Sequence, residues 1–262
     1  MLPENKIICG DNVEVLKTFP DDCIDLVVTS PPYDDLRTYA QDKPMSSLWD
    51  FEGLANQLWR VLKPGGVIVW VVADATANGS ETGTSFRQAL RFMGIGFRLH
   101  DTMIWDKGGF SAVGSTSVRY GPVSEFMFVF VKGKIKTFNP IYDRKNICKI
   151  HQRKSRTVRL PSGEMIRKTH TPKRSKEYGI RWNIWCITPA QNDHPAPFPE
   201  VLAADHIRSW SNKGGIVLDP FSGSGTTAKM AMILERKYIG IEVNPDYVKM
   251  SETRLKMSKG LF

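Results

Sequence analysis

The sequence contains few cysteines and lacks a long apolar run. Its four cysteines are widely separated and form no CxxC pair, which disfavours a zinc site or a disulfide framework and fits a reducing compartment. No apolar run approaches the roughly 18 residues that span a bilayer, and residues 1–5 have no signal-peptide core. We therefore expect a cytoplasmic protein without a metal site or a membrane anchor.

Acidic residues are scarce in one segment of the chain. The sequence has 36 Lys and Arg against 27 Asp and Glu, a net charge of +9. Residues 132–182 hold 16 of these basic residues and only three acidic ones, which gives the segment a charge of +13. The rest of the chain carries 20 basic and 24 acidic residues, a charge of −4. A strongly basic insert in a slightly acidic body predicts a polyanionic partner.

Short apolar runs alternate with helical patterns on both sides of this insert. We predict strands over residues 6–9, 24–29, 67–73, 98–105, 125–131, 215–218 and 238–242. Helices are predicted over 12–18, 51–62, 84–93, 198–209, 226–235 and 245–257, with Lys-Pro-Gly-Gly at 63–66 ending the second helix. This alternation indicates an α/β fold with a mostly parallel, mixed sheet covered on both faces. Prolines and glycines interrupt any long element in the insert.

A glycine loop follows the strand predicted at 215–218. Its sequence is Asp219-Pro220-Phe221-Ser222-Gly223-Ser224-Gly225-Thr226-Thr227, and a helix follows. Such a turn places backbone N–H groups and a helix N-terminus beside a ligand at the carboxyl end of the strand. Glu242 ends the next strand, where a carboxylate can accept both hydroxyls of a ribose. Because no Lys follows the glycines and the spacing is not GxGxxG, we infer a nucleoside ligand without phosphates, which suggests S-adenosylmethionine.

A rigid turn follows the strand predicted at 24–29. Its sequence is Ser30-Pro31-Pro32-Tyr33, and the two prolines fix φ and cannot donate N–H groups. A hydroxyl oxygen and a main-chain carbonyl in such a turn could together accept both N–H bonds of an exocyclic amino group. The aromatic face of Tyr33 could stack on the base that carries this group. The turn is therefore a candidate catalytic site.

The turn and the glycine loop together resemble the amino-methyltransferases of DNA, which modify cytosine N4 or adenine N6. The resemblance covers nearly the whole chain. The catalytic turn comes first, the basic insert lies between and the cofactor loop comes last, an order that is similar to that of the beta group. Serine at the first position of the turn resembles the cytosine-N4 enzymes more than the adenine-N6 enzymes.

The resemblance implies a Rossmann-like, S-adenosylmethionine-dependent methyltransferase fold in three parts. Residues 1–131 would form the catalytic half, 132–182 a target-recognition insert and 183–262 the cofactor-binding half. In the family, segments like Cys9-Gly10-Asp11 meet the adenine of the cofactor, and the stretch around His194 lines its methionine end. The implied cofactor-binding residues are Asp11, His194, Pro195, Phe198, Asp219, Pro220, Phe221, Gly223, Ser224, Gly225, Thr226 and Glu242.

The implied reaction is direct methyl transfer to the exocyclic amine of a base that is flipped out of the duplex. Ser30 and the Pro31 carbonyl would hold the amine, and Tyr33 would stack on the base. Double-stranded DNA is the implied partner, bound mainly through the insert. The predicted DNA-binding residues are Arg119, Arg144, Lys145, Arg153, Lys154, Arg156, Arg159, Arg167, Lys168, Lys173 and Arg174.

Several alternatives remain open at the level of sequence. The same pocket could accept adenine N6, and a non-catalytic nucleic-acid-binding protein could keep the fold. Charge alone does not separate DNA from RNA, because both present phosphates. The resemblance allows a cognate restriction enzyme and a homodimer as partners without requiring either.

Overall fold

The computed structural model describes residues 2–32, 49–109, 118–147, 155–169, 176–189 and 198–259. The chain forms two compact units. The first comprises Met1–Asn139 and Asn183–Phe262, and the second is Pro140–Trp182. Within the described ranges, no helix is long and apolar enough to cross a membrane.

An eight-stranded mixed sheet forms the centre of the first unit, with the strand order β1-β14-β13-β2-β3-β7-β6-β12. The strands are β1 (Lys6–Cys9), β2 (Ile24–Thr29), β3 (Leu62–Val72), β6 (Arg98–Asp106), β7 (Ser124–Val131), β12 (Ile184–Cys186), β13 (Ile216–Asp219) and β14 (Lys237–Glu242). Only β7 runs antiparallel to its neighbours β3 and β6, and the other pairs in this sheet are parallel. The predicted α/β fold with a mostly parallel sheet is therefore confirmed.

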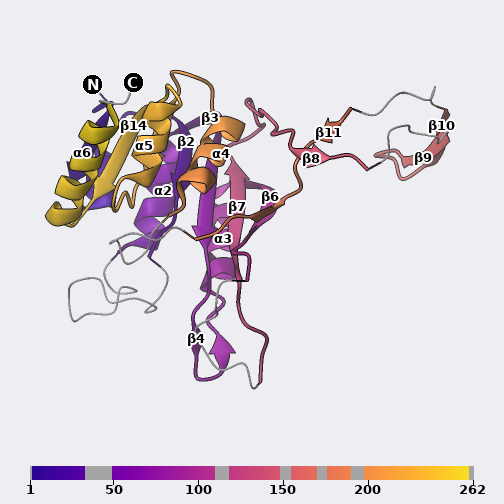
Figure 1. The fold of residues 1–262 in the computed structure, drawn as a ribbon, viewed down its shortest axis with the longest axis horizontal. Coiled ribbons are helices and arrows are strands. Elements are labelled where there is room, and N and C mark those ends of the chain that lie inside the picture. Colours follow the sequence, from indigo (N-terminus) through magenta and orange to yellow (C-terminus); the bar gives the residue numbers. More distant parts are fainter. Residues whose placement is uncertain are drawn as a thin grey trace. The chain divides into compact units, whose positions relative to one another are not determined.

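Six helices cover the two faces of this sheet in the described residues (Figure 1). They are α1 (Asn12–Lys17), α2 (Phe51–Val61), α3 (Thr84–Ile95), α4 (Glu200–Trp210), α5 (Thr226–Ile233) and α6 (Pro245–Lys259). Helix α2 contacts α1 and α3 in one layer, and α5 contacts α4 and α6 in the other. All six predicted helices and all seven predicted strands are present, with ends that differ by a few residues.

Alternate side chains of the central strand β3 pack on opposite faces of the sheet. Ile68, Trp70 and Val72 belong to the cluster that packs against α1, α2 and α3. The intervening Val71 pairs with Met127 of β7, whose sulfur lies 3.2 Å from Nε2 of His206 on α4. Both faces of the strand are therefore buried, as expected for a central strand between two helix layers.

The segment 63–66 follows the end of α2, as the sequence predicts, but it already belongs to the next strand. Helix α2 ends at Val61, but Leu62 and the Lys-Pro-Gly-Gly segment already belong to β3. The N–H of Gly65 donates to the Lys132 carbonyl, and the N–H of Lys132 donates to the Gly66 carbonyl. Pairing with a segment far along the chain extends the strand, which local turn chemistry could not predict.

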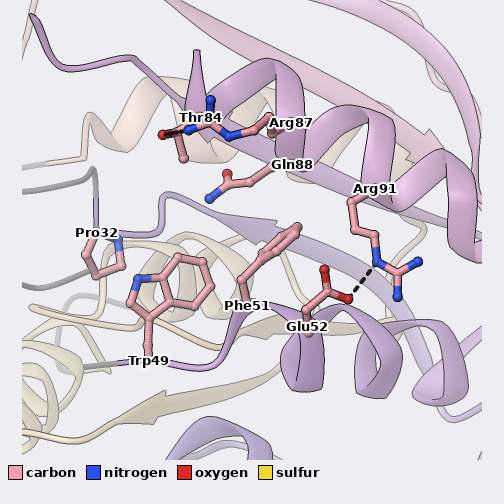
Figure 2. A pocket seen from close by; sticks show the side chains of 8 residues that line it. All are labelled: Pro32, Trp49, Phe51, Glu52, Thr84, Arg87, Gln88 and Arg91. Atoms are coloured by element: carbon pink, nitrogen blue, oxygen red, sulfur yellow. Dashed lines mark hydrogen bonds and ion pairs between the residues drawn. The ribbon is translucent and has the colours of Figure 1, made fainter. Parts of the chain in front are cut away.

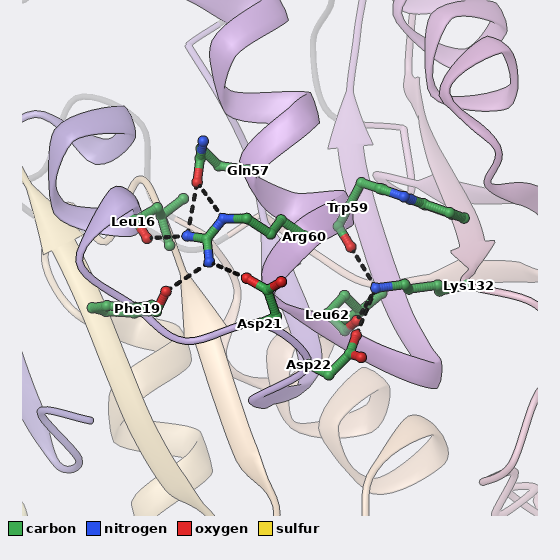
Figure 3. Close-up of polar contacts among 9 residues, drawn as sticks. All are labelled: Leu16, Phe19, Asp21, Asp22, Gln57, Trp59, Arg60, Leu62 and Lys132. Atoms are coloured by element: carbon green, nitrogen blue, oxygen red, sulfur yellow. Dashed lines mark hydrogen bonds and ion pairs between the residues drawn. The ribbon is translucent and has the colours of Figure 1, made fainter. Parts of the chain in front are cut away.

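Two basic side chains cap helix C-termini at the amino ends of the parallel strands (Figure 3). Arg60 donates to the carbonyls of Leu16 and Phe19 at the end of α1. Lys132 donates to the carbonyls of Trp59 and Leu62 at the end of α2, and it pairs with Asp22 at 2.7 Å. A cation at this position satisfies carbonyls that have no partner within the helix and opposes the helix dipole.

The second unit contains short antiparallel ribbons. Strand β8 (Arg144–Lys145) pairs with β11 (Tyr178–Gly179), and β9 (Ser155–Arg159) pairs with β10 (Met165–Thr169). A further ribbon, β4 (Thr76–Ala77) with β5 (Ser80–Glu81), belongs to the first unit. The predicted interruption of long elements between residues 132 and 182 matches these short strands.

Candidate active site

Four neighbouring parallel strands end at one edge of the sheet, and the predicted site residues follow them. Strand β13 lies between β2 and β14, and β14 also pairs with β1. Asp219 ends β13, Glu242 ends β14, and Ser30 and Asp11 come shortly after β2 and β1. In open α/β sheets, ligands bind outside the carboxyl ends of such strands.

A hydrogen bond joins the end of β2 to the start of the glycine loop. Thr29 Oγ1 donates to Asp219 Oδ1 over 2.7 Å, and the N–H of Phe221 donates to the same oxygen over 3.1 Å. Burial raises the pKa of Asp219 to about 6 despite these hydrogen bonds. Because Ser30 directly follows Thr29, this bond holds the catalytic turn beside the cofactor loop. Thr29 is thus a site residue that no motif in the sequence indicates.

The glycine loop crosses the neighbouring strand at very short distance. A Cβ atom at Gly240 would lie 2.5 Å from Ser222 Oγ, and one at Gly225 would lie 2.7 Å from Ser251 Cβ. Gly225 also has a φ of +78°, which side chains of L residues rarely adopt. The two glycines therefore allow the loop to pass over β14 and to begin α5.

Glu242 lies against this loop at the end of β14. Its Oε2 accepts from the N–H of Gly223 over 2.8 Å, and its Oε1 accepts from the N–H of Asn244 over 2.9 Å. Burial raises the pKa of this carboxyl group, while the backbone hydrogen bonds oppose the shift. Each oxygen retains further acceptor capacity for a hydroxyl group.

Asp11 lies near Glu242, after the adjacent strand. The Gly10 N–H donates to the Glu242 carbonyl over 3.0 Å, and Asp11 is the N-cap of α1, accepting from the Glu14 N–H. Asn12 is buried and donates through Nδ2 to the Pro220 carbonyl over 3.3 Å. The segment 10–12 is thus joined to both the glycine loop and the end of β14.

The catalytic turn is described as far as its second proline. Ser30 is half-buried, Pro31 is buried and Pro32 is half-buried. Tyr33, and with it the predicted base-stacking side chain, lies outside the described residues. Trp49 follows that segment, and its indole contacts the ring of Phe221 at a centroid distance of 5.0 Å.

A polar network from α6, which no motif in the sequence indicates, supports the glycine loop. Arg254 on α6 donates to the carbonyl and hydroxyl of Ser224 and to the hydroxyl of Thr226. It also pairs with Glu200, the first residue of α4, which accepts from Lys229 at 2.7 Å. Burial alone would raise the pKa of Glu200, but the hydrogen bonds from Lys229 and Arg254 lower it.

The remaining predicted cofactor residues come just before α4. His194 and Pro195 lie outside the described residues, whereas Phe198 is half-buried two positions before Glu200. Through Glu200, the Arg254 network therefore joins the glycine loop to the start of α4, which directly follows His194, Pro195 and Phe198 in the chain. The roles of the individual cofactor residues stay predictions.

The predicted DNA-binding residues divide between the two units. Arg119 belongs to the first unit, where it donates to Thr76 Oγ1 and the Gly79 carbonyl of the β4–β5 ribbon. In the second unit, Arg144 and Lys145 form β8, the backbone of Arg156 and Arg159 belongs to β9, and Arg167 and Lys168 belong to β10. Arg153, Lys154, Lys173 and Arg174 lie outside the described residues.

The donor and acceptor groups at the sheet edge suit a nucleoside rather than a phosphate. The carboxylates of Asp11 and Glu242 follow adjacent strands and can accept from neutral hydroxyl or amino groups. A negative pair of this kind would repel a phosphate. S-adenosylmethionine has a ribose and an adenine but no phosphate, and it fits this set of groups. No cluster of metal ligands is found among the described residues.

Comparisons with known proteins agree with this geometry. The sequence model of a family described as DNA methylase, the N6/N4 methyltransferases, matches residues 24–253. The chain is 50% identical over 252 residues to the orphan methyltransferase M.BamHII of Bacillus amyloliquefaciens, and the match covers 90% of each protein.

Solved structures share the fold. The TTHA0409 protein of Thermus thermophilus, crystallised in complex with S-adenosyl-L-methionine, is 26% identical with a TM-score of 0.66, covering 98% of this chain and 97% of that one. The cytosine-N4-specific PvuII DNA methyltransferase is 23% identical with a TM-score of 0.69, covering 97% and 90%. The match to the family over most of its length, together with the M.BamHII identity, shows that this chain belongs to the N6/N4 DNA methylase family.

Proposed function

We propose that this protein transfers a methyl group from S-adenosylmethionine to cytosine N4 in double-stranded DNA. The observation that carries the proposal is the hydrogen bond between Thr29 and Asp219, which fixes the Ser-Pro-Pro turn beside the glycine loop. An exocyclic amine held at the turn would therefore lie next to a cofactor bound at the loop. Ser30 at the first position favours cytosine through the family resemblance.

The chain's own groups would act mainly by positioning. Bound S-adenosylmethionine supplies an electrophilic methyl group on a sulfonium. Ser30 Oγ and the Pro31 carbonyl would accept the two N–H bonds of the amine and direct its lone pair. Alignment of the reacting atoms accounts for much of the rate. A neutral hydroxyl is a weak base, so the amine would lose its proton after the new bond forms.

The second unit would bind the phosphates of the DNA. Arg159 and Arg167 bond only to neutral oxygens in the described part of the chain, those of Gly163 and Ser155. Lys168 on the same ribbon is exposed as well. Such an arrangement suits a polyanion. The cytoplasmic location of the protein stays a prediction. So do a cognate restriction enzyme and a homodimer as its partners.

Adenine N6 is the alternative target, because a hydroxyl and a carbonyl can hold either amine. The test is incubation with duplex DNA and S-adenosylmethionine labelled at the methyl group, followed by digestion to nucleosides and mass spectrometry. Labelled N4-methyl-2′-deoxycytidine is the expected product. Labelled N6-methyl-2′-deoxyadenosine would replace the cytosine assignment, and no labelled nucleoside would refute the enzyme assignment.

Ser30→Ala provides a control in the same assay. Loss of one hydrogen bond to the amine should lower kcat about 10- to 100-fold while the affinity for S-adenosylmethionine stays unchanged. An equal loss of cofactor affinity would show that Ser30 does not act on the base.

A further inference from the structure

A cavity of about 330 Å³ lies between the start of α2 and the first two turns of α3, beside the turn that contains Pro32. Figure 2 shows the side chains that line it, which are Pro32, Trp49, Phe51, Glu52, Thr84, Arg87, Gln88 and Arg91. This volume lies at the lower end of the range for small-ligand sites in proteins. The cavity is large enough for a planar heterocycle.

Gln88 is the most buried polar residue of this cavity, with 6% of its surface exposed. Its Oε1 accepts a hydrogen bond of 2.9 Å from Trp70 Nε1. An indole nitrogen can only donate, so this bond fixes which end of the amide is the oxygen. The Nε2 group is therefore directed away from Trp70, toward the side formed by Pro32 and Trp49 (Figure 2).

The Nε2 group of Gln88 is available to a ligand. Within the described part of the chain, no hydrogen-bond partner of Nε2 is found, whereas Oε1 is occupied. Among the described residues, the fully enclosed polar atoms without a partner are Asn12 Oδ1 and Ser222 Oγ. Gln88 Nε2 is not one of them, so it is exposed to the cavity. An amide whose N–H groups face the cavity can donate to an acceptor that enters it.

The other lining residues suit a base with an attached phosphate. Trp49 and Phe51 are half-buried and form an apolar wall. Arg87 and Arg91 place two guanidinium groups at the cavity against one carboxylate, Glu52, which accepts from Arg91 at 2.6 Å. The excess positive charge favours an anionic group at this end.

The cavity shares one wall residue with the turn at Ser30–Pro32, and a second wall residue contacts the glycine loop. Pro32 belongs to the catalytic turn, in which Ser30 and the Pro31 carbonyl precede it. Trp49 contacts Phe221 of the glycine loop at a centroid distance of 5.0 Å. A planar group in the cavity would therefore lie close to both the turn and the cofactor loop.

Building on the proposed function, we propose that this cavity holds the extruded nucleotide and that Gln88 determines which bases are accepted. Its Nε2 donates to the ring nitrogen beside the exocyclic amine, N3 of cytosine or N1 of adenine. Thymine and guanine carry an N–H at the equivalent position, so two donors would oppose each other. Such a mismatch of buried donors gives strong discrimination.

Gln88→Glu tests this role with a near-isosteric change. The glutamate retains an oxygen for Trp70 and replaces the donating Nε2 with an acceptor. We expect kcat/KM for DNA to fall about 10- to 100-fold, with unchanged affinity for S-adenosylmethionine. Gln57→Glu on α2, whose Oε1 accepts from Arg60 at 3.0 Å, is the matched control and should behave like the native protein. Native kcat/KM in Gln88→Glu, or an equal loss of cofactor affinity, would overturn the proposal.

Base analogues test the same contact without relying on the stability of a variant. Duplexes would carry 3-deazacytosine or 1-deazaadenine at the mapped target, so that C–H replaces the ring nitrogen. We expect the analogue to lower turnover by the native protein about tenfold more than turnover by Gln88→Glu. If the analogue lowers turnover by the same factor in the native protein and in Gln88→Glu, the hydrogen bond from Gln88 Nε2 to the ring nitrogen is refuted. Failure of the native protein to methylate unmodified DNA would instead refute the proposed function.

Discussion

Basic side chains in the two units of this protein have different partners. In the first unit they connect elements: Arg60 and Lys132 cap helices, and Arg254 joins α6 to the glycine loop and to Glu200. In the second unit, the described side chains of Lys145, Arg159, Arg167 and Lys168 form no ion pair. Arg181 of the second unit does pair with Asp143, but the four residues above leave their charge for an external anion, whereas the basic residues named in the first unit stabilise the fold.

The unpaired charge of the second unit should contribute most to DNA affinity. Replacing Lys145, Arg159, Arg167 and Lys168 together with Gln should weaken duplex binding roughly 100-fold in 0.1 M salt, because each phosphate contact releases a counterion. The slope of log K against log salt should become less steep by about 0.9 per lost contact. Fluorescence anisotropy at several salt concentrations measures both quantities.

A matched set of variants in the first unit sharpens this result. Lys17, Lys213 and Lys249 are exposed, Lys237 is partly exposed, and all four pair with carboxylates. Their replacement with Gln should leave both the affinity and the salt slope close to native values. Equal losses in the two sets would show that total charge, rather than its position, determines binding.

Replacement of Asp219 tests whether burial of this carboxyl group in the first unit makes stability depend on pH. Its pKa is raised from 3.8 to about 6, so the native state binds this proton more tightly than the unfolded state. The stabilisation is complete below about pH 4 and is lost as pH rises through about 6, which costs up to about 3 kcal/mol. Asp219→Asn should remove this loss while keeping an acceptor for Thr29. Urea unfolding from pH 4.5 to 7.5 measures the difference, and identical pH profiles would contradict the burial of a charge.

Arg254 tests whether a structural ion pair also organises the cofactor loop. Arg254→Ala removes donors to Ser224 and Thr226 and leaves Glu200 with Lys229 alone. We expect a loss of about 1–2 kcal/mol in stability and a roughly tenfold weaker affinity for S-adenosylmethionine, measured by calorimetry. Arg254→Lys should restore part of both. If Arg254→Ala binds S-adenosylmethionine with native affinity, Arg254 stabilises the fold but does not contribute to cofactor binding.

Replacement of Lys132 should have the smallest effect, and it tests whether a basic residue next to the second unit binds DNA or stabilises the fold. It belongs by sequence to the basic segment 132–182, yet it caps α2 and pairs with Asp22 in the first unit. Lys132→Met should lower the free energy of unfolding by about 1 kcal/mol. Duplex affinity should stay native, and a loss comparable to that of the second-unit variants would place Lys132 with the DNA-binding residues.

The sequence predicts the parts of the site that are local. The turn at Ser30 and the loop from Asp219 to Thr227 are short runs with prolines and glycines, whose backbone preferences are strong. The helices and most strands follow from apolar spacing. The fold and the family could therefore be inferred from the order of residues alone.

Contacts between distant residues could not be predicted in this way. The bond from Thr29 to Asp219, the Arg254 network and the pairing of Trp70 with Gln88 depend on strand order and side-chain geometry. Strand β12 has only three residues, too few to show a pattern, and the basic ribbon β9–β10 lacks an apolar pattern that would identify it. The cavity at Gln88 gives no signal in the sequence at all.

Steady-state methyl transfer by the four-charge variant of the second unit tests the separation of DNA binding from chemistry most directly. Initial rates would be measured against the concentration of duplex DNA at saturating S-adenosylmethionine, with the labelled nucleoside identified. The account predicts a KM for DNA raised roughly 100-fold with a native kcat and the same product. A lowered kcat with a native KM would contradict it, because the basic side chains of residues 140–182 would then act in catalysis rather than in DNA binding.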